Sequence, residues 1–166
     1  MSGGVLVAGI GNIFQSDDAF GVEVALRLRA VELPDGVRVE DYGIRGVHLA
    51  YELLDGYDAL ILVDALPMGE PPGTLVVMEP ELDAPAGEDG APVIDAHTMS
   101  PDVVLGTLAR LGGHVERIYV LGCQPANLQE GMALSPPVAA AIDGAVEMCI
   151  ELVAEILEPA GKGTPS

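Results

Sequence analysis

The sequence predicts an α/β fold, a three-layer sandwich in which a mostly parallel, twisted five-stranded sheet carries helices on both faces. Short apolar runs alternate along the chain with segments of helical periodicity, a pattern typical of open parallel sheets. Two of these runs, 5–8 and 59–63, are uninterrupted and suit central strands buried on both faces. The length of 166 residues fits one domain. We predict that domain over residues 1–158 and a frayed tail over 159–166.

Local signals place the remaining elements. Asp17 and Asp18 stand near the start of the first helical segment, where carboxylates stabilise a helix amino terminus. Ser135 and Pro136 suit the opening of the last helix. Prolines flank the fourth strand, which indicates an edge position. After the strand at 5–8, the expected elements are a helix at 19–30, a strand at 37–41, a short helix at 46–54, a strand at 59–63, an edge strand at 73–78, an acidic surface loop at 79–92, a helix at 100–111, a strand at 117–122 and a helix from 135 to about 157.

Composition excludes several classes of function. The net charge is −19, so the surface repels nucleic-acid backbones and anionic lipid, and we expect neither as a partner. The 49% hydrophobic content and a mean hydropathy of +0.39 indicate a packed core rather than disorder. We expect no signal peptide, and no apolar run in the sequence reaches membrane-spanning length. Cys123 and Cys149 lack CxxC spacing. We therefore expect a cytoplasmic protein with reduced thiols.

Polar residues follow the first predicted strand, at the sheet edge where open α/β folds bind ligands. Gly9 and Gly11 resemble the start of a dinucleotide-binding loop, but Phe14 stands where the third glycine belongs. Two carboxylates, Asp17 and Asp18, also stand where a pyrophosphate would need a neutral or positive surround. A nucleotide-binding role is therefore disfavoured, although the glycines could serve only a tight turn and the aspartates only a helix start.

Asp64 and His97 are the other candidates for this edge. Asp64 directly follows five apolar strand residues, where a carboxylate without a partner is costly to bury. Taken singly, each residue could be structural, and His48 and His114 suit surface positions. Together, two carboxylates and one imidazole form a site for a divalent transition ion with coordination positions left open.

Several motifs of this sequence resemble those of a known family. The motif GIGN at 9–12 with DDAFG at 17–21, the strand end LVDA at 62–65, and His97 resemble the hydrogenase maturation endopeptidases. The segments DYGIRG at 41–46 and LSP at 134–136 also resemble family motifs, and the similarity extends to about residue 157. Tyr42 stands where the family usually has glycine, and 43–46 departs from its usual Gly-Thr-x-Gly.

The resemblance implies a function. The family removes the C-terminal extension from the large-subunit precursor of nickel-iron hydrogenases, so the expected partner is the nickel-loaded precursor. Its metal-contacting positions correspond to Asp18, Asp64 and His97, with Asp18 or Asp64 as the base that activates water. We expect supporting roles for Gly9, Gly11, Asn12, Asp17 and Asp41, the last in precursor recognition. The nickel would arrive with the substrate, so we expect no permanent cofactor, and we expect a monomer.

Two other functions remain open at this stage. A hydrolase of the same fold could hold its own zinc or manganese ion and act on a different precursor. A nickel-binding chaperone could dock on hydrogenase precursors without cutting them. The direction in which Asp17 and Asp18 point is also open, because adjacent helical residues differ by about 100°.

Overall fold

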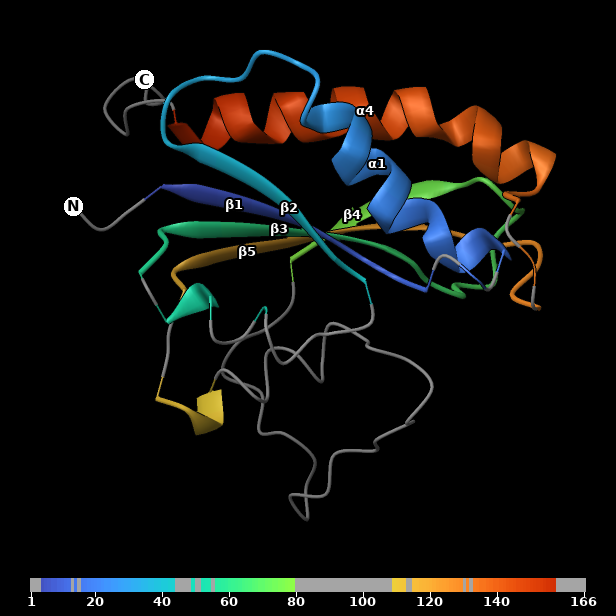
Figure 1. The fold of residues 1–166 in the computed structure, drawn as a ribbon, viewed down its shortest axis with the longest axis horizontal. Coiled ribbons are helices and arrows are strands. Elements are labelled where there is room, and N and C mark those ends of the chain that lie inside the picture. Colours follow the sequence, from blue (N-terminus) through green and yellow to red (C-terminus); the bar gives the residue numbers. More distant parts are fainter. Residues whose placement is uncertain are drawn as a thin grey trace.

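A computed structural model describes residues 4–12, 14, 16–43, 49, 52–54, 56–79, 109–112, 115–129, 131 and 133–157. These residues form a five-stranded sheet with the strand order β2-β1-β3-β5-β4, and two helices lie along one side of it (Figure 1). The elements are β1 (Val5–Ile10), the 3₁₀ turn η1 (Ser16–Ala19), α1 (Phe20–Leu28), β2 (Val37–Gly43), β3 (Ala59–Ala65), β4 (Leu75–Met78), β5 (Arg117–Cys123) and α4 (Pro136–Leu157).

The sheet is mostly parallel, as predicted. Strand β1 pairs in parallel with β2 and β3, and β3 pairs in parallel with β5. Only β4, the predicted edge strand, runs antiparallel, alongside β5. The parallel strands therefore place their carboxyl ends at one edge of the sheet, where the candidate residues are expected to gather.

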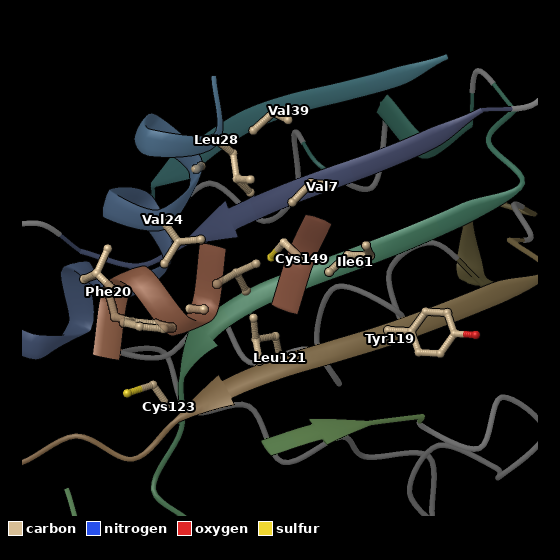
Figure 2. Packing of buried hydrophobic residues seen from close by; sticks show 14 of the residues in the cluster. Val7, Phe20, Val24, Leu28, Val39, Ile61, Tyr119, Leu121, Cys123 and Cys149 are labelled. Carbon is tan, nitrogen blue, oxygen red and sulfur yellow. The ribbon is translucent and has the colours of Figure 1, made fainter. Parts of the chain in front are cut away.

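The larger apolar cluster lies between the sheet and the two helices. It joins Phe20 and Val24 of α1 and Cys149 of α4 to alternate residues of the strands, such as Val7 and Ile61 (Figure 2). Cys123 and Cys149 are both buried and free. This packing explains the continuous apolar runs, because each central strand supplies side chains to both faces of the sheet.

The second cluster covers the opposite face of the sheet. Leu6, Leu60 and Leu62 pack there with Leu49 and Leu53, and residues 49, 52 and 53 are helical. The helices predicted at 46–54 and 100–111 lie largely outside the described residues, as does the predicted loop at 79–92. Among the described residues, no helix is long and apolar enough to cross a membrane.

Five predicted boundaries were wrong at the carboxyl edge of the sheet. Strand β1 continues to Ile10 and β2 to Gly43, beyond the predicted ends at 8 and 41. Strand β3 continues through Asp64 to Ala65, so Asp64 lies inside the strand rather than after it. The first helix is preceded by the 3₁₀ turn η1 at Ser16–Ala19, and α1 itself starts at Phe20 and ends at Leu28. Strand β5 extends to Cys123.

Candidate functional site

Glycines allow the start of α1 to lie directly on the sheet. A Cβ added to Gly9 would collide with the backbone carbonyl of Gly21, and one added to Gly21 would collide with the carbonyl of Val63. Gly11 has a φ of +148°, and a Cβ there would collide with the carbonyl of Asp18. Gly9 and Gly11 therefore hold η1 and α1 against the ends of β1 and β3, which places Asp18 at that edge.

Asp18 is half-buried at this edge and held by the loop that follows β1. Its Oδ2 accepts a hydrogen bond from the backbone N–H of Asn12 at 2.9 Å. The Asn12 side chain in turn accepts one from the N–H of Phe14 at 2.9 Å. Burial raises the pKa of Asp18, and the hydrogen bond from Asn12 partly opposes that shift. Asn12 thus orients the carboxylate through its backbone and closes the loop through its side chain.

Asp64 is the most strongly perturbed carboxyl group of the described residues. It is 5% exposed and lies on the same face of β3 as Leu60 and Leu62, which belong to the second cluster. Burial raises its pKa well above the ordinary value, the nearby charge of Asp18 raises it further, and the amide of Ala65 opposes the shift. Asp18 and Asp64 therefore form an electrostatically coupled pair in which Asp18 ionises more readily.

Asp17 points away from this pair and into the segment that follows β5. Its carboxylate is fully buried and accepts hydrogen bonds from the N–H groups of Ala126 at 2.8 Å and Asn127 at 2.9 Å. It also accepts hydrogen bonds from the N–H of Ser135 at 2.7 Å and from its hydroxyl at 2.8 Å. These bonds fix the direction that the sequence left open: Asp17 anchors the segment after β5, and the carboxylate whose charge raises the pKa of Asp64 is that of Asp18.

The hydrogen bonds to Asp17 predict acid-sensitive stability. Burial acts to raise the pKa of Asp17, but the bonds from Ser135, Ala126 and Asn127 outweigh it and lower the pKa. A lowered carboxyl pKa stabilises the fold above the unfolded-state value, and this stabilisation is lost as the pH falls through the folded-state pKa. We expect Asp17→Asn to lower the free energy of unfolding by about 2 kcal/mol at pH 7, because it leaves buried donors unpaired. In urea unfolding between pH 2 and 7, the difference in free energy of unfolding between the wild type and Asp17→Asn should shrink as the pH falls. A difference that grows in acid would contradict this account.

Asp41 is not brought to the pair. Its Oδ1 lies 3.2 Å from Nη1 of Arg29, which follows α1, so Asp41 faces the side of the sheet that α1 covers. Asp64 faces the other side, with β1 between their two strands. Among the described residues, the side chain of Asp41 pairs with Arg29 rather than with Asp18 or Asp64, and the expectation that Asp41 supports precursor recognition stays untested.

The expected histidine lies outside the described residues, as do His48 and His114. Within the part of the chain that the structure describes, no group of three metal-ligating side chains converges. What that part contributes is the pair of Asp18 and Asp64, two oxygen donors of the kind that divalent ions accept. A role for His97 stays a prediction.

Sequence reasoning missed two residues beside this site. Ser16 is buried with a φ of +50°, and its hydroxyl donates to the carbonyl of Gln129 at 2.7 Å. Gln124 directly follows β5, and its side chain accepts hydrogen bonds from the N–H groups of Met68 and Glu70. Its position after a strand end was the one available signal, while nothing local marks Ser16.

Comparisons with a family model and with known proteins find similar chains. The model of the family described as HycI, hydrogenase maturation protease, matches residues 22–152. The hydrogenase expression/formation protein HupD of Rhizobium leguminosarum bv. viciae is 34% identical over 168 residues, covering 97% of this chain and 82% of its own.

Two solved structures are similar throughout. The hydrogenase maturating endopeptidase HybD from E. coli has a TM-score of 0.74 and 26% identity, covering 93% of this chain and 94% of its own. The hydrogenase 2 maturation peptidase from a Thaumarchaeota archaeon has a TM-score of 0.71 and 31% identity, covering 91% of this chain and 98% of its own. The family match covers most of the chain, including Asp64, but begins after Asp18. Together with the 34% identical relative, it shows that the chain belongs to the hydrogenase maturation protease family.

Proposed function

We propose that this maturation endopeptidase removes the C-terminal extension of a hydrogenase large-subunit precursor, and that Asp18, Asp64 and His97 bind the nickel that the precursor carries. The observation that supports this proposal is the coupled pair of Asp18 and Asp64 at the carboxyl ends of β1 and β3. Membership of the family supports the reaction, and the structures called endopeptidases share the fold.

The charge of the pair suits the capture of a cation. Burial and repulsion from Asp18 favour a proton on Asp64. A divalent ion bound by the two carboxylates would offset this repulsion, so Asp64 could lose its proton when the ion binds. Two carboxylates and one imidazole also leave coordination positions open, which ligands from the precursor can fill. The nickel is then part of the substrate, leaves with it, and is not a permanent cofactor of the protein.

The same pair can supply the base for hydrolysis. A peptide bond is cut when water adds to the carbonyl and the leaving amine takes up a proton. We assign the base to Asp18, because it ionises more readily than Asp64 and is half-buried rather than fully enclosed. Nickel on the precursor would polarise the carbonyl, and Asp18 would take the proton from the attacking water. We further propose that the protein acts as a monomer in the cytoplasm.

The test compares nickel-loaded and nickel-free precursor. Each is incubated with the purified protein and analysed by mass spectrometry for loss of its C-terminal peptide. We expect cleavage of the nickel-loaded precursor alone. Equal cleavage of both forms would contradict nickel recognition, and no cleavage of either would favour a chaperone that docks without cutting.

Metal analysis of the protein alone completes this test. Protein purified without added ions should contain less than about 0.1 equivalent of transition metal if nickel arrives with the substrate. A stoichiometric zinc or manganese content would instead indicate a hydrolase that keeps its own ion.

A further inference from the structure

Two segments that flank the carboxylate pair are both fastened to one stretch of chain, Cys123 to Ser135, which the structure describes except at 130 and 132. We call this stretch the 123–135 segment. It begins at the end of β5, next to β3, and ends where α4 starts. No element of the proposed chemistry uses it, yet most of its hydrogen bonds lead to residues adjacent to Asp18 or to the loop after Asp64.

On the Asp18 side, the 123–135 segment is hydrogen-bonded to residues 14, 16 and 17. The N–H of Asp17 donates to the carbonyl of Asn127 at 2.9 Å, and the N–H of Ser16 donates to the carbonyl of Gly131 at 2.8 Å. The N–H of Gly131 donates back to the carbonyl of Phe14 at 2.9 Å. With the four bonds to the Asp17 carboxylate, the residues just before Asp18 are held through both backbone and side chain.

On the Asp64 side, the same segment holds the loop at 66–74. The N–H of Leu66 donates to the carbonyl of Cys123 at 2.9 Å, two residues after Asp64. Gln124 exchanges backbone bonds with Gly73 at 2.8 Å and Thr74 at 2.9 Å. Its side-chain oxygen accepts hydrogen bonds from the N–H groups of Met68 and Glu70, the latter at 3.2 Å. One glutamine thus fastens the loop at four points.

We propose that the 123–135 segment is a brace that sets the position of Asp18 relative to Asp64, with Asp17 and Gln124 as its positioning residues. The inference rests on the proposed function, because it assigns the brace to that site. Metal binding and hydrolysis both require the two carboxylates to be held to within about 0.5 Å. Neither β1 nor β3 alone provides this, since Asp18 lies eight residues beyond the end of β1.

The test uses variants that break one attachment each. Asp17→Asn removes the charge that holds Ala126, Asn127 and Ser135, and Gln124→Met keeps the length of the side chain but removes the acceptor for Met68 and Glu70. Ser135→Ala removes one of the four bonds to Asp17, and Ser135→Thr keeps the hydroxyl. Each variant is titrated with Ni²⁺ alone by calorimetry and assayed for kcat and KM on the nickel-loaded precursor, with rates corrected for the folded fraction.

We expect Asp17→Asn and Gln124→Met to weaken Ni²⁺ affinity about 10- to 100-fold and to lower kcat by a similar factor, as is usual for residues that orient metal ligands. Ser135→Ala should show a smaller loss, and Ser135→Thr should recover most of it. Val153→Ala is the matched control, because it shortens a buried side chain in the last two turns of α4. It should lower stability while leaving both Ni²⁺ affinity and kcat unchanged.

A purely structural segment gives a different result. In that case Asp17→Asn and Gln124→Met would behave like Val153→Ala, with lower stability but wild-type affinity and kcat in the folded fraction, and the proposal would be overturned. Asp64→Asn, assayed in parallel, separates this failure from failure of the proposed function. If Asp64→Asn is inactive while the brace variants are normal, only the brace is wrong; if Asp64→Asn processes normally, the site itself is wrong.

Discussion

Asp64→Asn is expected to lower the rate of precursor processing by at least about 100-fold, the low end of what a carboxylate acting on a bound ion or on water contributes. The substitution keeps the shape of the side chain but removes one of the two charges that would bind the cation. The rate is measured as the appearance of mature large subunit by mass spectrometry. Processing at the wild-type rate would remove Asp64 from the chemistry.

The same substitution should also make the protein more stable at neutral pH. The pKa of Asp64 is raised in the folded state, mainly by burial and then by Asp18. A raised carboxyl pKa means that the folded state binds the proton more tightly, so stability falls as the pH rises from about 4 toward the folded-state pKa. An asparagine carries no such penalty. Urea unfolding at pH 4 and pH 8 should therefore show that Asp64→Asn gains on the wild type as the pH rises.

Asp143→Asn is the matched control for both measurements. It makes the same chemical change on α4, where the side chain of Asp143 is 92% exposed and lies 3.5 Å from Arg27. An exposed ion pair of this kind contributes little, so processing should be unchanged and stability should change by less than about 0.5 kcal/mol. If Asp143→Asn became as much more stable as Asp64→Asn, the effect would come from net charge alone.

Gly21→Ala is expected to destabilise the fold by about 3 kcal/mol or more, because its methyl group would meet backbone rather than a movable side chain. The added Cβ would collide with the carbonyl of Val63 and would lie 2.5 Å from the carbonyl of Ile10. Relief requires α1 and η1 to move off the sheet, which would also displace Asp18. Chemical denaturation measures the stability, and the folded fraction should show reduced processing.

Gly144→Ala provides the comparison for this glycine. Gly144 lies within α4, and its added Cβ would stand 3.4 Å from Cδ1 of Leu75, an ordinary contact. Alanine is favoured over glycine inside a helix by up to about 1 kcal/mol, so this variant should be as stable as the wild type or more so. Equal loss of stability in the two variants would contradict the claim that close approach of α1 to β1 and β3 depends on Gly21.

The sheet could be predicted from the sequence because its signals are local. The apolar runs at 5–8 and 59–63 are the central strands β1 and β3, and the prolines around 73–78 mark the edge strand β4. The 3₁₀ turn before α1 could not be predicted in this way. Ser16 adopts a φ of +50° while bonded to Gln129 and Gly131, which are more than one hundred positions away, and no local pattern records such contacts.

The candidate site was predictable in part. The rule that ligands bind at strand ends led to Asp18 and Asp64, and the charge of Asp18 contributes to the raised pKa of Asp64. Their role as a site stays a prediction. Tertiary contacts decided the direction of Asp17, because its partners lie in the 123–135 segment. The side of the sheet that Asp41 faces could be read from the sequence: Val37, Val39 and Asp41 are alternate residues of β2, and the two valines pack on the cluster beneath α1. The supporting role of Asp41 stays a prediction.

A crystal structure of the protein soaked with Ni²⁺ or Cd²⁺ tests the central claim most directly. We predict one ion at the carboxyl edge of the sheet, bound by the carboxylates of Asp18 and Asp64 and by the imidazole of His97, with the remaining positions open to solvent. An ion bound by Asp17 in place of Asp18, or an ion bound elsewhere while Asp18 and Asp64 bind none, would contradict the nickel-reading site.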